Sequence, residues 1–424
     1  MHKKISTEII NDFQKGPIRR SLFSNGATLL EHSATGFAGA KININFLAGS
    51  VFENENQHGM AHIIEHLLFK EVGSSLVSEL EHYGAEINAY TFKENVCFEL
   101  SCLARKVEDL LPLFLDLIFN FNFTEDQFRK EKNVIIQELF EDKDDHETQG
   151  LEYIFKKNFP LNLGHPIGGE ASLIKKYTIK DIQSYYKKYF TPNRLIITVV
   201  SGLEHTTIDH TLLNSFSKYF KAKEDKPFRI QSLKKSKKIN HFVASYKRKI
   251  SSPILLFSFD GPSLSSPDYY TYAILDEILF DGLSSLFFKY FRDRNPYVYG
   301  FGSALNSFSP CANYVMIFNT QTKYIPNIKK EIKDVLLQCS TDASVLDKVD
   351  FIKTRLVESF ELAFDDLNER AEFIADNEIY QLNELDIKII IEKISRVSVK
   401  GIQTLAKKLY MSDYSILTIQ SQDL

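Results

Sequence analysis

The chain has 424 residues, which predicts two or three domains because one domain usually holds about 100–200 residues. Hydrophobic residues make up 44% and charged residues 25%, a composition typical of globular proteins. With 51 basic and 55 acidic residues, the formal net charge of -4 excludes the strongly basic class of nucleic-acid-binding proteins.

The N-terminal sequence and the cysteines bear on the cellular compartment of the protein. The N-terminus, MHKKISTE, lacks the apolar stretch of a signal peptide, and no run is long and apolar enough to span a bilayer. We therefore expect a cytoplasmic protein without membrane association, unless a leader has been removed. The four cysteines lack metal-ligand spacing and are expected to be buried thiols of a reducing compartment, with pairing left open: Cys97, Cys102, Cys311 and Cys339.

The first half alternates predicted strands and helices. Residues 41–47 (KININFL) have the period-two pattern of a half-buried strand, and residues 60–70 form an apolar stretch compatible with a helix. The further predicted elements are a helix at 75–83 ending at Gly84, a strand or hairpin at 87–103, helices at 107–119, 125–140 and 178–190, and a buried strand at 195–200.

A basic stretch separates the halves. Residues 221–249 are rich in lysine and arginine, and we interpret them as a solvated linker rather than a patch for acidic ligands. The second half then repeats the element order of the first: strand 253–259, helices 268–279 and up to Arg292, strands 299–303 and 314–319, helices 325–339 and 346–364, and strand 414–420. This order predicts a duplicated domain, although no repeat is visible at residue level.

The strongest local signal is the sequence HIIEH at residues 62–66. On a helix, His62 and His66 share one face and can reach one metal ion. Glu65 lies on the same side, where a carboxylate can take a proton from metal-bound water. Zinc suits two imidazoles and one carboxylate, with a fourth coordination position left for water. The alternative is a pair of ordinary surface histidines.

A third metal ligand must come from another segment. Glu131 and Glu138 are two helical turns apart, so they share one helix face and fit a ligand with a supporting partner. Glu141 and Asp142 are competitors for the ligand role, and a solvated helix flank is the alternative interpretation.

These blocks resemble a known family. Residues 49–53 (GSVFE) and 59–70 (GMAHIIEHLLFK), with the downstream glutamates, are similar to the metal site of the pitrilysin/insulinase family of inverzincin metallopeptidases, which includes the mitochondrial processing peptidases. The resemblance implies one zinc ion per chain, held by His62, His66 and Glu138. It also implies that Glu65 is the general base and that Glu131 supports the metal site.

Two further segments of the first half match the family. Residues 84–91 (GAEINAYT) resemble its edge strand, where a peptide substrate adds as an extra strand, with Asn88 and Ala89 as contact positions. A tight turn into a strand would have the same residues. The segment 165–168 (HPIG) matches a recurrent family segment, which we interpret as structural.

The second half contains a block similar to the family's closing half-site. Within 280–299, Arg292 and Tyr299 have the spacing of the family's substrate-contacting pair, where arginine holds a substrate carbonyl and tyrosine stabilises the oxyanion. The block departs from the family's pattern at two places: Asn295-Pro296-Tyr297 stands where a glycine is usual, and the glycine pair is reduced to Asp281-Gly282.

The resemblance implies an α+β fold of two duplicated domains, each an antiparallel sheet packed with helices. We expect a zinc-binding domain at 1–222, a linker at 223–240 and a homologous domain at 241–424. Such a chain is half of a closed peptidase chamber, which implies a homodimer or a heterodimer with a homologous subunit. The expected activity is zinc-dependent hydrolysis of short or unfolded peptides. The rival hypotheses are a non-catalytic, substrate-presenting subunit and a zinc-carrying binding module.

Overall fold

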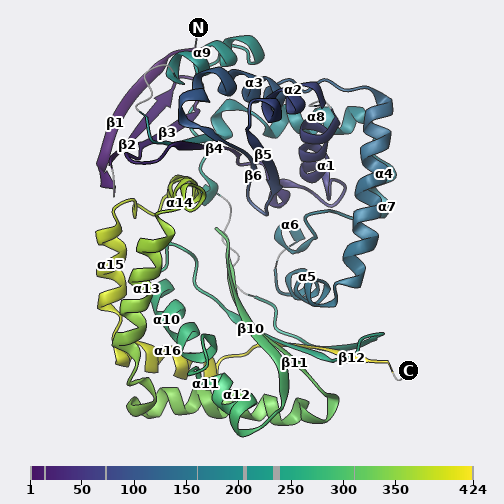
Figure 1. The fold of residues 1–424 in the computed structure, drawn as a ribbon. Helices are drawn as coiled ribbons and strands as arrows, with labels where there is room; N and C mark the ends of the chain where they lie inside the picture. The colour runs from purple at the N-terminus through teal and green to yellow at the C-terminus, as the bar shows by residue number, and fades with distance from the viewer. Residues whose placement is uncertain are drawn as a thin grey trace. The chain divides into compact units, whose positions relative to one another are not determined.

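The computed structural model describes residues 2–13, 16–71, 74–159, 161–203, 208–232, 239–309 and 311–422. The chain forms two compact units, each an α+β assembly of one sheet and its helices (Figure 1). The first unit comprises Met1–Glu141, Leu161–Ser232 and Leu362–Ile387, and the second comprises Asp142–Pro160, Leu233–Glu361 and Lys388–Leu424. The predicted α+β class with two sheets is confirmed.

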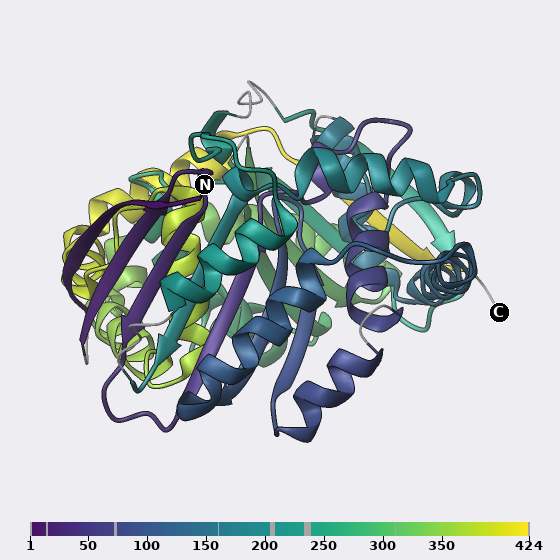
Figure 2. The ribbon, with the colours of Figure 1, turned by 90° about the horizontal axis from the view of Figure 1, so that it is seen from above.

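A seven-stranded sheet organises the first unit. Its strands lie in the order β1 (Lys4–Phe13), β2 (Gly16–Phe23), β3 (Thr28–Ser33), β7 (Leu195–Ser201), β4 (Gly39–Phe46), β6 (Val96–Leu103) and β5 (Glu86–Thr91). Alternate residues of β4, among them Ile42 and Ile44, join the main core, in which helices α3 (Val107–Phe119) and α9 (Ile208–Tyr219) lie over one face of the sheet (Figure 2). The strand predicted at 41–47 is therefore present, but it is not half-buried: its polar residues Lys41, Asn43 and Asn45 are buried as well.

A five-stranded sheet organises the second unit. Its order is β10 (Val298–Ser307), β11 (Ala312–Thr320), β9 (Ile254–Asp260), β12 (Ser415–Ser421) and β8 (Val243–Arg248). The first sheet contains the same arrangement, because β3, β7, β4, β6 and β5 follow the order of β8, β12, β9, β11 and β10. The shared topology supports the predicted duplication, with the hairpin β1–β2 added to the first copy.

The prediction of wholly antiparallel sheets is wrong for one pair in each unit. Strand β3 pairs with β7 in parallel, and β8 pairs with β12 in parallel. In both cases several helices separate the two strands along the chain, which allows the second strand to return in the same direction. The other strand pairs of both sheets are antiparallel.

Each half of the chain contributes one helix to the compact unit formed mainly by the other half. Helix α5 (His146–Asn158), from the first half, packs on β12 and β9 of the second unit through Ile154. Helix α14 (Leu367–Tyr380), from the second half, packs on β7 and β4 of the first unit. The contiguous domains predicted at 1–222 and 241–424 therefore differ from the compact units in these segments.

Part of the predicted linker packs on the first unit. Arg229 pairs with Glu378 of α14, and Ile230 is fully buried. The lysine-rich centre at 234–238 lies outside the described residues. Farther along the basic stretch 221–249, β8 pairs with β12, because Ala244 and Tyr246 pack against the core of the second unit.

A repeat at residue level becomes visible once the two sheets are compared. Helix α8 (Ile179–Tyr189) precedes β7 as helix α16 (Val399–Met411) precedes β12, and their sequences IKDIQSYYKK and VKGIQTLAKK align without gaps. Ile182 and Ile402 occupy equivalent positions and are both fully buried. The statement that no repeat is visible at residue level is therefore corrected for this segment.

Several smaller expectations concern the surface and the thiols. Among the described residues, no helix combines the length and apolar character needed to cross a membrane. Cys97, Cys102 and Cys339 are buried, as expected, whereas Cys311 is only half-buried. Burial raises the pKa of the Cys102 thiol to about 11, which keeps this thiol protonated and unreactive at neutral pH.

Candidate metal centre

The histidines of the HIIEH sequence lie on the short helix α1 (Met60–His66), which continues into a π-helical turn at Leu67–Glu71. Ile63 and Ile64 are buried in the core, so His62 and His66, which flank them in the sequence, project from a different side of the helix. The two imidazole rings lie 4.5 Å apart between centroids. The predicted helix at 60–70 therefore brings both histidines to one place.

Helix α4 (Glu125–Glu141) supplies the carboxylates on the other side. The Glu131 Oε2 atom is 3.1 Å from His66 Nδ1, and the Glu138 Oε2 atom is 3.3 Å from His66 Nε2. His66 therefore uses both ring nitrogens, one toward each glutamate. The predicted pairing of Glu131 and Glu138 on one helix face is present in the structure.

The donor set fits zinc. The ligand atoms of His62, His66 and Glu138 all lie within 4.8 Å of one another, and in the described part of the chain this is the group identified as able to hold a metal ion. Zinc binds nitrogen and oxygen at about 2.0–2.2 Å in a tetrahedron, which places neighbouring ligand atoms roughly 3.3 Å apart. The separation of His66 Nε2 from Glu138 Oε2 is 3.3 Å. Glu141 and Asp142, the predicted competitors, are not members of the group.

The Glu131 carboxylate has the position of a supporting partner. It is buried and lies beside His66 Nδ1, on the side of the ring away from Glu138. A carboxylate there fixes the tautomer and the orientation of a histidine that binds metal through Nε2. The geometry therefore separates the two glutamates of α4 into a candidate ligand and a candidate orienting group.

Glu65 lies between the metal-ligand side chains and the edge of the sheet. Its Oε2 atom is 4.0 Å from His62 Nε2 and accepts a hydrogen bond of 2.9 Å from the Thr91 hydroxyl. Thr91 ends the edge strand β5, and the sequence interpretation assigned it no role. Because this bond holds the carboxylate in place, Thr91 is a further residue of the site.

Strand β5 is the outermost strand of the first sheet and pairs with β6. Asn88 is exposed, while Ala89 packs against the main core. The predicted edge position of Asn88 and Ala89 is therefore present. A strand at a sheet edge can bind an extended peptide through its backbone. Thr91 places Glu65 at the end of this same strand.

Arg292 and Tyr299 lie in the second unit. Arg292 is on a π-helical segment (Lys289–Arg294), and its guanidinium donates a hydrogen bond to the backbone carbonyl of Tyr299 on β10. The Tyr299 side chain is 58% exposed, and its hydroxyl accepts a hydrogen bond from the Gln321 amide. The structure thus joins the two predicted residues and adds Gln321, whose role no sequence motif indicated.

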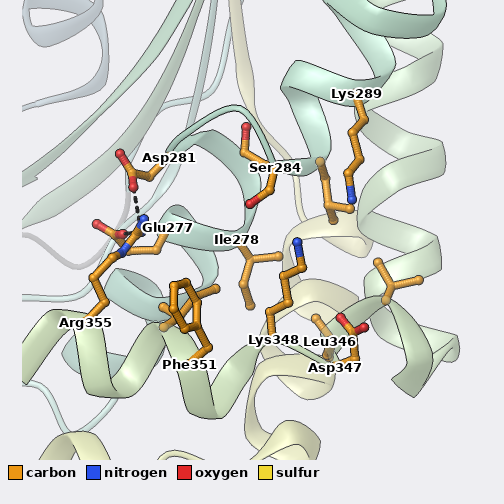
Figure 3. A pocket seen from close by; sticks show the side chains of 14 residues that line it. Glu277, Ile278, Asp281, Ser284, Lys289, Leu346, Asp347, Lys348, Phe351 and Arg355 are labelled. Atoms are coloured by element: carbon orange, nitrogen blue, oxygen red, sulfur yellow. Dashed lines mark hydrogen bonds and ion pairs between the residues drawn. The ribbon is translucent and has the colours of Figure 1, made fainter.

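A hollow in the second unit lies between the end of α10 (Tyr269–Phe280) and the start of α13 (Val349–Ala363) (Figure 3). Arg355 of α13 forms ion pairs there with Glu277 and Asp281. In the element order, α10 and α13 correspond to α1 and α4. In the second unit an ion pair thus links α10 and α13, the counterparts of the two helices that carry the metal-ligand group in the first unit.

Comparisons with known proteins agree with this arrangement. Residues 28–169 match the family model "Insulinase (Peptidase family M16)", and residues 176–343 match "Peptidase M16 inactive domain". The uncharacterized zinc protease YmxG of Bacillus subtilis is 22% identical over 409 residues, which cover 95% of this chain and 98% of that protein. A probable mitochondrial-processing peptidase subunit beta of Arabidopsis thaliana is 26% identical over 62% of this chain and 50% of its own length.

The fold is shared with solved structures. A crystal structure from Pseudomonas fluorescens, described as a peptidase M16 inactive domain, superposes with a TM-score of 0.83 at 16% identity and covers 96% of this chain and 98% of its own. A protease from Helicobacter pylori superposes with a TM-score of 0.79, also at 16% identity, over 95% of this chain and 99% of its own. At this level of identity the likeness establishes the two-domain fold.

Proposed function

Because the chain belongs to the insulinase family of peptidases, family M16, we propose that it is a zinc endopeptidase acting on short or unfolded peptides. The proposal rests above all on the position of His66 between two glutamates of α4, at 3.1 and 3.3 Å. It assigns one zinc ion per chain to His62, His66 and Glu138, with Glu131 orienting His66.

The chain's own residues provide the remaining chemistry. When bound, zinc would act as a Lewis acid toward the scissile carbonyl and the attacking water. Glu65 takes the proton of that water, and the Thr91 hydroxyl keeps the carboxylate in place. Strand β5 binds the peptide in extended form, with Asn88 and Ala89 beside the substrate backbone. Arg292 and Tyr299 hold the substrate carbonyl and stabilise the oxyanion.

The function is tested by metal content and by cleavage together. Purified protein should contain about one zinc per chain and should cut a random peptide library. Removal of the metal by a chelator should abolish cleavage, and added zinc should restore it. A stably folded domain should survive the same incubation, since strand addition needs an unpaired backbone. Cleavage that persists after complete metal removal would contradict the proposal.

The rival is a non-catalytic subunit that presents substrate to a partner. Two observations support this alternative: residues 176–343 match an inactive-domain model, and the chain is similar to a processing-peptidase subunit. The group of His62, His66 and Glu138, with Glu65 beside His62, favours catalysis, because presentation needs no general base. Stoichiometric zinc without cleavage of any peptide would favour the rival.

The assembly proposed is a homodimer in which each site takes zinc from one chain and Arg292 and Tyr299 from its mate. One chain carries both sets of residues, and a twofold pairing creates two equivalent sites. A mixture of Glu65→Gln chains with Tyr299→Phe chains should regain activity on subunit exchange, since one site of the mixed dimer is intact. Absence of activity despite proven exchange would indicate a site within one chain or a different partner.

A further inference from the structure

A buried carboxylate lies behind the metal-binding helix. Glu53 is fully buried, and its two oxygens accept hydrogen bonds of 2.8 Å each from the backbone N–H groups of Gly59 and Ala61. These groups belong to the first turn of α1, where backbone N–H groups have no partner within the helix. Glu53 therefore holds the start of the helix that carries His62, Glu65 and His66.

A histidine from a distant segment completes this contact. The His165 Nε2 atom lies 2.8 Å from Glu53 Oε2, and His165 is 4% exposed. The His58 ring stacks on His165 with centroids 3.8 Å apart, and the Lys93 ammonium donates to the His165 carbonyl. Burial raises the pKa of the Glu53 carboxyl, and the hydrogen bond from His165 acts in the opposite direction.

The loop after His165 packs against the same turn of α1. Gly59 and Gly169 both have positive φ, +92° and +81°, which favours glycine. A Cβ atom at Gly169 would lie 2.6 Å from the Gly59 Cα atom, and one at Gly168 would lie 3.9 Å from His62 Nδ1. The segment 165–169 therefore packs directly against the start of α1 and beside one candidate ligand.

We propose that Glu53 and His165 are positioning residues, which set the place of α1 and thereby the distances of His62, Glu65 and His66 from the carboxylates of α4. Glu53 accepts two buried hydrogen bonds from the start of this helix, and a third joins it to His165. A buried polar pair often adds little net stability compared with apolar packing, so we assign this contact a role in positioning the helix. The catalytic part of the inference rests on the proposed zinc peptidase function.

The test compares His165→Leu, which removes the donor, with His165→Gln, whose amide nitrogen can reach the position of Nε2. His210→Leu is the control, because His210 is an exposed histidine on α9 of the same unit. Backbone amide exchange of residues 59–66 is measured on metal-free protein. The visible absorption spectrum of the cobalt(II)-loaded protein and the values of kcat and KM on a peptide substrate are then compared.

In His165→Leu, exchange of residues 59–66 should accelerate while exchange in β7 stays unchanged, and the cobalt spectrum should change. The value of kcat should fall by about 10²-fold with little change in KM, because a small displacement of catalytic groups has that effect. His165→Gln should restore a large part of each property. Exchange and a cobalt spectrum equal to those of the parent in folded His165→Leu would overturn the proposal.

A second variant keeps the test decisive if His165→Leu fails to fold. Lys93→Met removes the bond to the His165 carbonyl and should accelerate the exchange of residues 59–66 to a smaller extent. Exchange of residues 59–66 equal to that of the parent in folded Lys93→Met would then overturn the proposal. A parent protein that binds no cobalt and cuts no peptide would refute the proposed function, while the exchange data would still decide the role of Glu53 and His165.

Discussion

Glu65→Gln should lower kcat by about 10²–10⁴-fold, the contribution usual for a general base, while zinc content stays unchanged. Glutamine has the shape of glutamate and keeps an oxygen that can accept the Thr91 hydrogen bond, so the local structure should persist. The side chain would lose only its ability to take a proton. The measurement is kcat on a peptide substrate with zinc content determined in the same sample.

The matched control for this change is Glu79→Gln. Glu79 is an exposed carboxylate on the neighbouring helix α2 (Ser74–His82), and its replacement should leave kcat as in the parent. Full activity of Glu65→Gln would exclude Glu65 as the base. Loss of zinc in Glu65→Gln would mean that the carboxylate binds metal instead of taking the proton.

Glu138→Ala should remove most of the bound zinc and with it the activity. The substitution deletes the oxygen that faces His66 Nε2 and leaves two histidines as the remaining ligands of the group. Glu141→Ala is the control one turn farther along, because the Glu141 carboxylate is exposed and accepts a hydrogen bond from Gln137. Zinc content after dialysis against a weak chelator measures the difference.

Glu131→Ala should fall between these two variants. The lost contact to His66 Nδ1 orients the ring without binding metal, and such partners typically contribute about 10–100-fold in affinity or activity. Removal of zinc by Glu141→Ala alone would contradict the ligand assignment. A Glu131→Ala variant with less zinc than Glu138→Ala would reverse the roles of the two glutamates.

Local patterns predicted the core of the candidate site. The spacing of His62, Glu65 and His66 within one helical turn is a property of the chain itself, and a helix brings these groups to one side wherever it packs. The same holds for Glu131 and Glu138 on α4. The edge position of β5 was inferred from resemblance, since whether a strand has a neighbour on both sides depends on the whole sheet.

The sequence by itself thus determined which residue types face one another on each helix, and through the order of elements it indicated two related α+β halves. Only the tertiary structure decided which carboxylate approaches which nitrogen of His66, because α1 and α4 meet through packing. Tertiary structure also decided the parallel pairs β3–β7 and β8–β12 and the exchange of α5 and α14. These features depend on contacts between residues far apart in the chain, such as Glu53 and His165, which no local spacing encodes.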